Sequence, residues 1–215
     1  MAKPIVMIGA GGHAAVLAEL LLAEGRQLIA VVSPEPIKTN SPLAGLERLA
    51  SDDSLLASYS PEQVELVNGV GSIPGNSLRQ KLFEYFSERG YNFASVISPY
   101  AILSKYLKLE EGVQIMAGAI VQTSVSIGKN SIINTGAIVE HDCVIGPNNH
   151  IAPGVTLSGG VCTERNVHIG TGASVIQGIK IAEYAVVGAG TTIARDVLKK
   201  QVIIPAASRI ISQEK

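Results

Sequence analysis

The chain has 215 residues, with 17 basic and 18 acidic side chains and a formal net charge of −1 at neutral pH. This near balance argues against a nucleic-acid-binding protein held to its ligand by a broad basic face. Aromatic residues make up 4% of the chain and Trp is absent, which favours a narrow interior. The apolar run at residues 5–8 is too short for a signal peptide or a membrane span, which predicts a cytoplasmic protein without membrane insertion.

The N-terminal segment predicts a strand, a helix and a second strand. Residues 4–13 read PIVMIGAGGH, a buried strand that ends in a glycine-rich turn. Residues 13–23 have the apolar spacing of a helix, and residues 28–32 form the second strand. In this arrangement the backbone N–H groups at the start of the helix can hold a phosphate.

The glycine turn alone is weak evidence for a nucleotide site. Ala14 stands where the dinucleotide fingerprint needs its last Gly, and Ser33 and Pro34 stand where an acidic residue is expected. Close packing of strand and helix would explain the glycines equally well.

A second strand–turn–helix unit follows. A short helix is expected near residues 45–50, a strand over residues 63–70, and a helix from Asn76 to Arg89. Ligands of open α/β sheets bind at the carboxyl ends of the strands. The glycine turns at residues 9–12 and 69–71 are therefore expected to share one crevice.

An aliphatic residue recurs at every sixth position from residue 97 to residue 193, with the single exception of Thr163. A helix needs a period near 3.6 and a half-buried strand a period of 2, so the period of six predicts a β-solenoid with three hexads in each triangular coil. Gly, Asn or Asp recurs three residues after the aliphatic positions, as at Gly136, Asp142 and Asp196, and these types fit a corner with positive φ. The chain therefore divides into an α/β domain (residues 1–92), a β-helix (93–197) and a short tail (198–215).

The solenoid also carries outward-facing apolar residues, each one position before an inward residue. They are Ile120, Ile132, Ile138 and Val144. Exposed apolar surface of this kind indicates a partner, and we expect a symmetric trimer.

The candidates for acid–base chemistry are the four histidines, His13, His141, His150 and His168. His150 and His168 each precede an inward position and are one coil apart, so they are expected to stack about 4.8 Å apart on one outer face. His141 lies at a corner beside Asp142. A carboxylate on one imidazole nitrogen fixes the tautomer and raises the basicity of the other nitrogen. His141 is therefore the candidate base, although a solvated surface histidine is the simpler alternative.

Three motifs together resemble a known family. They are the Gly-x-Gly-Gly-His opening, Asn76-x-x-Arg79, and the segment VEHDCVIG at residues 139–146. They resemble bacterial sugar acetyltransferases of the sialic acid and bacillosamine type, which are hexapeptide-repeat acyltransferases, over nearly the whole chain. The resemblance implies a Rossmann-like βαβ domain followed by a left-handed parallel β-helix. It also implies a homotrimer that uses acetyl-CoA and no metal, with active sites between neighbouring solenoids.

The resemblance further implies roles for individual residues. His141 would be the general base and Asp142 the acid that tunes it. The acetyl-CoA site would include His150, Thr171 and Ala189. The nucleotide-sugar site would include Gly11, Gly12, His13, Ser33, Pro34 and Gly71. The nearest likeness is to enzymes that N-acetylate the 4-amino group of a UDP-linked amino-dideoxy sugar in bacillosamine-type synthesis.

Other functions stay open at the level of sequence. The same base could serve O-acetylation of sialic acid or of another sugar hydroxyl. A nucleotide-sugar-binding protein without catalysis would use the α/β domain and leave the solenoid structural. A zinc protein like the γ-class carbonic anhydrases needs three histidines that converge on the metal. His150 and His168 stack, but the position of His141 in the sequence does not bring it to them.

Overall fold

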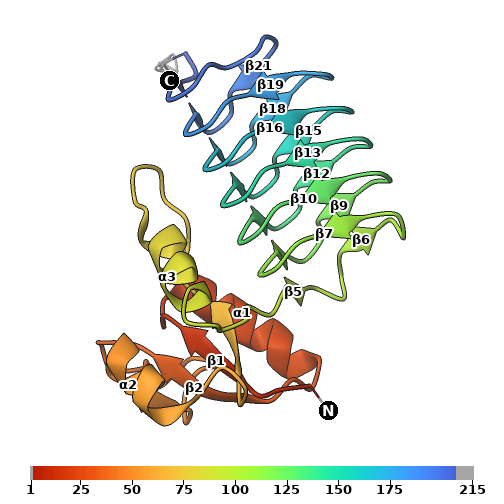
Figure 1. Ribbon diagram of the computed structural model, residues 1–215. Coiled ribbons are helices and arrows are strands. Elements are labelled where there is room, and N and C mark those ends of the chain that lie inside the picture. Colours follow the sequence, from red (N-terminus) through yellow and green to blue (C-terminus); the bar gives the residue numbers. More distant parts are fainter. Residues whose placement is uncertain (1, 207–215) are drawn as a thin grey trace, which may run out of the picture.

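The computed structural model describes residues 2–206 and shows an α/β domain joined to a long triangular solenoid (Figure 1). The elements of the α/β domain are β1 (Ile5–Ile8), α1 (Gly12–Ala23), β2 (Leu28–Val32), β3 (Glu47–Leu49), α2 (Asp52–Ser58), β4 (Glu65–Asn68) and α3 (Leu78–Ser87). The four strands form a parallel sheet in the order β3-β2-β1-β4. The expected β-α-β opening is confirmed.

The helix expected near residues 45–50 is wrong. Those residues form β3, which pairs with β2 at the edge of the sheet, and the helix α2 follows it. Pairing with a neighbouring strand decides the conformation of this short segment, which local propensity does not fix. The start of α2 carries a local signal, because the Ser51 hydroxyl accepts a hydrogen bond from the Ser54 N–H, and Asp52 and Asp53 lie in the first turn.

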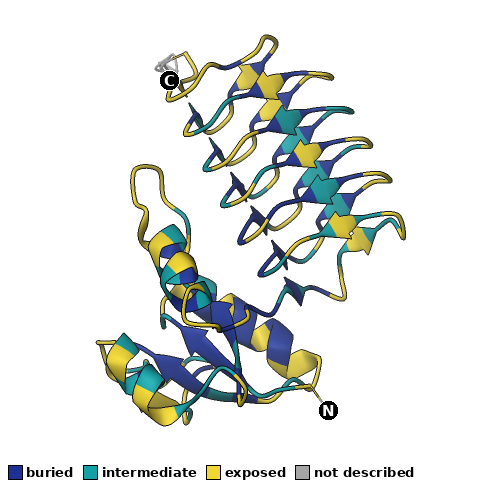
Figure 2. Cartoon of the chain, in the orientation of Figure 1, coloured by how far each residue is buried: buried dark blue, intermediate teal, exposed yellow. Residues whose placement is uncertain are grey.

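The sheet is covered on both faces. β1 is buried along its whole length (Figure 2). One face of the sheet packs against α1 and the other against α2 and α3. At Gly69 a Cβ atom would lie 2.7 Å from the Ala14 Cβ and 2.8 Å from the Ile8 carbonyl oxygen. Gly69 is therefore required by the close packing of α1 on the sheet.

The solenoid has three flat faces, and each coil adds one strand to each face. The first face holds β5 (Val96–Ile97), β8 (Gln114–Ile115), β11 (Ile132–Ile133), β14 (His150–Ile151), β17 (His168–Ile169), β20 (Val186–Val187) and β22 (Val202–Ile203). The second face holds β6 (Ile102–Leu103), β9 (Ile120–Val121), β12 (Ile138–Val139), β15 (Thr156–Leu157), β18 (Ser174–Val175) and β21 (Thr192–Ile193). The third face holds β7 (Lys108–Leu109), β10 (Ser126–Ile127), β13 (Val144–Ile145), β16 (Cys162–Thr163) and β19 (Lys180–Ile181). All pairings are parallel and almost all join residues 18 apart, as between Ile138 and Thr156.

The predicted inward positions are confirmed. From Ile115 to Ile193 every sixth residue is buried, and together these side chains form the core of the solenoid. The exception, Thr163, is buried as well, and its hydroxyl accepts a hydrogen bond from the buried Asn149 amide. The polar residue thus satisfies another polar group inside the prism, as a buried amide requires.

The predicted corners are confirmed too, apart from Asp196. Gly, Asn or Asp adopts positive φ at corner after corner, as at Gly136 (φ 65°) and Asp142 (φ 60°). Tyr184 (φ 60°) adopts the same conformation although it is bulky and not one of the predicted types. After the last full hexad the chain rejoins the first face, where Val202 pairs with Val186, 16 residues earlier. Residues 207–215 of the expected tail lie outside the described residues.

The α/β domain packs on the lower half of the first face. Ile132 is fully buried in a cluster that contains Val96, Met116 and residues of α1. The expectation that Ile132 presents apolar surface to a partner is therefore wrong, because its own α/β domain covers it. Val144, on the third face, is 46% exposed. Within residues 2–206, no helix combines the length and the apolarity that crossing a membrane would require.

Candidate active site

The two glycine turns lie side by side, as expected. They follow β1 and β4, which are neighbours in the sheet. A Cβ on Gly9 (φ 92°) would lie 3.1 Å from the Val70 side chain, and one on Gly71 would lie 3.7 Å from the Cβ of His13. These short separations place the two turns in one crevice at the carboxyl edge of the sheet.

Gly11 and Gly12 differ from the other glycines of the crevice. Both are exposed, neither has positive φ, and a Cβ at either position would meet no atom within 4 Å. Gly11 is the N-cap of α1 and offers no side-chain cap, and the first turn holds no acidic residue. Packing and backbone conformation therefore do not require glycine here. The bare N–H groups at the start of α1 are open to an anionic ligand.

Ser33 and Pro34 follow β2 at the same edge of the sheet. The buried Ser33 hydroxyl donates to the Glu35 carbonyl at 2.8 Å. The Arg48 guanidinium donates to the carbonyls of Ser33 (3.0 Å) and Pro34 (3.2 Å). The hydroxyl is thus engaged within its own turn, and the exposed surface here is that of Pro34.

His13, in the first turn of α1, reaches the solenoid. Its Nε2 lies 2.8 Å from Oε1 of the buried Gln114 on β8. The Gln114 amide nitrogen donates to the Asn68 carbonyl at 2.8 Å, so Oε1 faces the imidazole and His13 Nε2–H is the donor. Burial lowers the pKa of His13, although the hydrogen bond to Gln114 acts in the opposite direction. His13 is therefore neutral at pH 7, with Nδ1 as the unprotonated nitrogen.

Arg79, the first buried residue of α3, joins the two parts of the chain. Its guanidinium donates to the carbonyls of Asn68 (2.9 Å), Val70 (2.7 Å) and Asn130 (3.2 Å), and Asn130 belongs to the solenoid. No carboxylate pairs with it among the described residues. Burial lowers the pKa of Arg79 to about 9, so the side chain still brings a positive charge beneath the second glycine turn at neutral pH.

His150 and His168 stack on the first face as predicted, with ring centroids 4.9 Å apart. His150 Nδ1 lies 3.2 Å from the Ser72 carbonyl, so Nδ1–H is the donor, and Nε2 accepts a hydrogen bond from the Asn134 amide at 3.0 Å. Burial, followed by the neighbouring His168, lowers the pKa of His150 to about 3. Burial also lowers the pKa of His168. Neither ring carries a charge at neutral pH.

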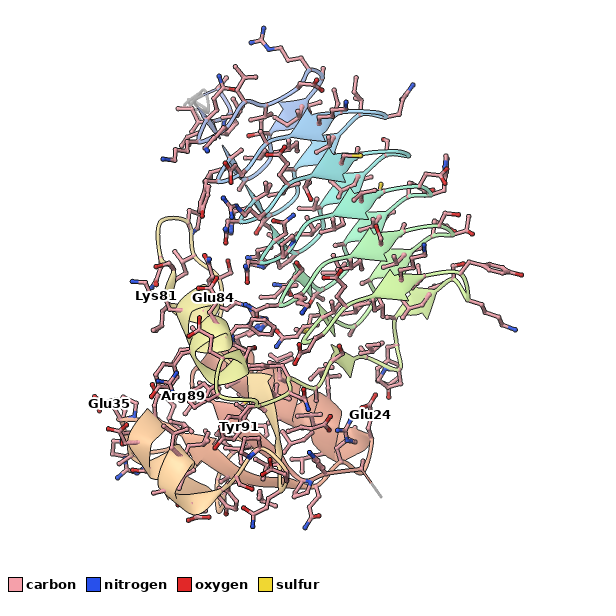
Figure 3. The ribbon with its side chains drawn as sticks, viewed as in Figure 1. Glu24, Glu35, Lys81, Glu84, Arg89 and Tyr91 are labelled. Atoms are coloured by element: carbon pink, nitrogen blue, oxygen red, sulfur yellow. The ribbon has the colours of Figure 1, made fainter. Side chains whose placement is uncertain are left out.

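A cavity of about 600 Å³ lies between the loop that precedes α3 and the upper half of the first face. Figure 1 shows this loop standing beside the solenoid, and Figure 3 shows the charged side chains of α3, such as Lys81 and Glu84, below it. Residues 72–77 form one wall, and His168, Tyr184, Val186 and Val202 form the other. The cavity has the size of a small-molecule site, and it adjoins His150 through Ser72.

His141 lies apart from this region. It occupies a corner between β12 of the second face and β13 of the third face. Its Nδ1 lies 2.8 Å from Oδ2 of Asp142, and the side chains are 60% and 64% exposed. Because the carboxylate can only accept, Nδ1–H donates and Nε2 is the basic nitrogen. This pairing of imidazole and carboxylate is the one that the sequence predicted.

The prism separates the predicted site residues. The α/β domain packs on the first face, whereas His141 lies at the corner opposite that face. Thr171 and Ala189 are exposed and lie one coil apart at the corner between the first and second faces. A single chain thus brings His13 and His150 together near the crevice but does not bring His141 to them.

Two family models match the chain. The PglD N-terminal domain matches residues 4–86, and the bacterial transferase hexapeptide (six repeats) matches residues 125–159. No curated protein sequence matches the chain.

Solved structures match over almost the full length. The H141N variant of perosamine N-acetyltransferase from Caulobacter crescentus, in complex with CoA and GDP-perosamine, is 32% identical, with 99% of each chain covered and a TM-score of 0.83. The acetyltransferase domain of PglB from Neisseria gonorrhoeae, in complex with acetyl coenzyme A, is 30% identical over 94% of this chain and 96% of that one, with a TM-score of 0.84.

The chain belongs to the hexapeptide-repeat sugar N-acetyltransferases. The fold expected from the sequence, an α/β domain followed by a left-handed parallel β-helix, is confirmed for this acetyltransferase. Two polar contacts between its two parts were not found from the sequence. They are made by Gln114 with His13 and by Arg79 with Asn130. Only the Arg79 motif gave a signal. Among residues 2–206, no group of three or more His, Cys, Asp or Glu side chains could hold a metal ion.

Proposed function

We propose that this acetyltransferase moves the acetyl group of acetyl-CoA to the 4-amino group of a nucleoside-diphosphate-linked amino-dideoxy sugar. The observation that carries the proposal is the open helix start at Gly11 and Gly12, where neither packing nor backbone requires glycine. Bare N–H groups and the helix dipole favour a phosphate-bearing acceptor over a free sugar. The relatives solved with GDP-perosamine and with acetyl coenzyme A support the same pair of substrates.

His141 acts as the general base in this proposal. The amine nitrogen attacks the thioester carbonyl carbon, Nε2 of His141 takes the amine proton, and the C–S bond breaks to release CoA as the thiolate. Asp142 holds Nδ1–H and stabilises the imidazolium that forms. The Caulobacter crescentus relative was solved with substitutions at its own histidine 141, to Asn and to Ala, in complex with CoA and GDP-perosamine.

The active site is shared between chains of a homotrimer. The acceptor crevice lies on the first-face side of the prism, and His141 lies at the opposite corner. A neighbouring chain that places its His141 corner against the crevice would complete the site. His13, His150, Thr171 and Ala189 would then come from one chain and the base from the next. The exposed Val144, close to the His141 corner, supports a covered surface there.

Acceptor identity is tested by measuring CoA release with four candidate acceptors. A UDP-linked 4-amino-dideoxy sugar of the bacillosamine type is the acceptor we propose, and GDP-perosamine is the matched alternative nucleotide. A free amino sugar and free sialic acid complete the set. We expect kcat/KM to be highest with the nucleotide-linked amines. Equal turnover of free sugars, or acetylation of sialic acid hydroxyls, would overturn the proposal.

Sharing of the site is tested by coexpressing two impaired chains, His141→Ala and Gly11→Val, and assaying them at an acceptor concentration well below the raised KM of Gly11→Val. If one chain supplies the crevice and its neighbour supplies the base, random trimers regain roughly a quarter of the wild-type sites. If the site were built within one chain, mixed trimers would regain no activity above that of the two variants alone. Each variant expressed alone provides the baseline, and light scattering at micromolar concentration checks the trimer itself.

A further inference from the structure

The corner that carries His141 recurs once per coil, two residues after each strand of the second face. Residues at this corner are 18 apart and lie above one another along the prism. From the first coil to the last they are Lys105, Thr123, His141, Gly159, Gln177 and Arg195. Five of the six carry a long or branched side chain. The one residue without a side chain stands directly after His141 in the stack.

The imidazole of His141 occupies the space left at Gly159. A Cβ on Gly159 would lie 2.6 Å from Cε1, 2.7 Å from Nε2 and 3.2 Å from Nδ1 of His141. The distances to Cε1 and Nε2 are too short for a real Cβ, and the distance to Nδ1 is tighter than most real Cβ contacts. The ring therefore lies flat on the α-carbon of Gly159. Gly159 does not have positive φ, so the backbone conformation there does not require glycine.

The surface under the ring is rigid although the ring itself is exposed. The Gly160 N–H donates to the His141 carbonyl at 2.8 Å, and the Gly178 N–H donates to the Gly159 carbonyl at 3.0 Å. Ladder hydrogen bonds thus hold the Gly159 backbone to the coils on both sides. A side chain added at Gly159 would displace the exposed imidazole rather than the backbone.

We propose that Gly159 is a positioning residue for the imidazole of His141, an inference that rests on the role of His141 as base in the proposed function. Asp142 holds Nδ1 at one edge of the ring, and the bare α-carbon of Gly159 supports its face. Together they fix both the tautomer and the direction of Nε2 in a side chain that is otherwise 60% exposed. Without this support the ring would adopt other rotamers and Nε2 would leave the line of proton transfer.

The test is Gly159→Ala, with Thr123→Ala as the matched control on the other side of His141 in the same stack. We expect Gly159→Ala to lower kcat about 10²-fold, with smaller changes in both KM values and an unchanged thermal midpoint. Thr123→Ala should keep wild-type kcat. A second readout needs no turnover. The Cε1–H signal of His141, assigned by its loss in His141→Ala, should shift in the Gly159→Ala NMR spectrum and stay in place in the control.

The double variant His141→Ala/Gly159→Ala separates the explanations. If Gly159 acts through the imidazole, adding Gly159→Ala lowers neither the residual turnover nor the thermal midpoint of His141→Ala any further. An equal loss in both backgrounds, or unfolding of both chains that carry Gly159→Ala, would show that the clash is elsewhere and would overturn the inference. Full turnover of Gly159→Ala beside an inactive His141→Ala would also overturn it and leave the proposed function intact. Full turnover of His141→Ala would instead refute the proposed base, whatever Gly159 does.

Discussion

At the scale of single residues, the sequence showed what is local and hid what the fold brings together. Asp142 follows His141 directly, so the pair was predicted without knowledge of the coil, and the 2.8 Å contact agrees with it. His13 and Gln114 are 101 positions apart, and their contact depends on how the α/β domain docks. Gly159 lies between these cases, since only the 18-residue register of the solenoid shows that it adjoins His141.

The residue-scale prediction concerns the base. His141→Ala should lower kcat by about 10²–10⁴-fold, the usual contribution of a general base. Asp142→Asn should lower it less, because the amide can still accept from Nδ1–H but no longer stabilises the imidazolium. Binding of CoA, measured by calorimetry, should persist in both variants. Near-normal turnover of His141→Ala would mean that another group takes the proton.

At the scale of elements, period and corner chemistry fixed the solenoid almost completely. Inward positions and positive-φ corners follow from six-residue spacing, because each hexad repeats the same short strand and the same corner. Segments without a repeat were less predictable. The segment of β3 carries no local signal for a strand, because its conformation comes from pairing with β2. Ile132 has the outward position of its neighbours, yet the docked α/β domain buries it.

The element-scale prediction uses the start of α1. Gly11→Val places a branched side chain where the protein backbone is expected to approach the ligand. A Cβ at this position would meet no protein atom within 4 Å, so the substitution should not disturb the fold. We expect the KM of the nucleotide-sugar acceptor to rise and the KM of acetyl-CoA to change little. The thermal midpoint should stay near that of the wild type. Gly69→Val is the contrasting variant, because it clashes with Ala14 and Ile8 and should destabilise the fold. Two unchanged KM values for Gly11→Val would indicate that this turn does not contact the acceptor.

At the scale of the whole molecule, the two parts of the chain meet through polar groups that are buried and neutral, apart from one arginine. His13, His150 and His168 line this junction, and burial lowers the pKa of each. Arg79 provides the positive charge and donates only to carbonyls. The junction therefore accommodates uncharged imidazoles, and protonation of these histidines destabilises it.

The whole-molecule prediction follows from the sign of these shifts. The pKa of His150 is about 3 in the fold against an ordinary value of 6.5. Between these values the unfolded chain binds more protons than the folded one, so the free energy of unfolding falls as the pH drops below 6.5. The contribution of His150 to this slope reaches about 1.4 kcal/mol per pH unit. Urea titrations at pH 7 and pH 5 measure it, and His150→Asn should make the dependence shallower. An equal slope in this variant would show that His150 is not the group responsible.

Each coil of the solenoid bonds only to the coils before and after it, and the α/β domain packs only on the lower coils. In such a one-dimensional stack, local opening starts at the uncovered end. Tyr184, Val186 and Val202, the far wall of the cavity, belong to that end. A ligand that fills the cavity bridges these fraying coils to the loop of the α/β domain. Occupancy should therefore slow amide hydrogen exchange in the last coils more than in the middle ones, and the loss of bound ligand should loosen the same coils.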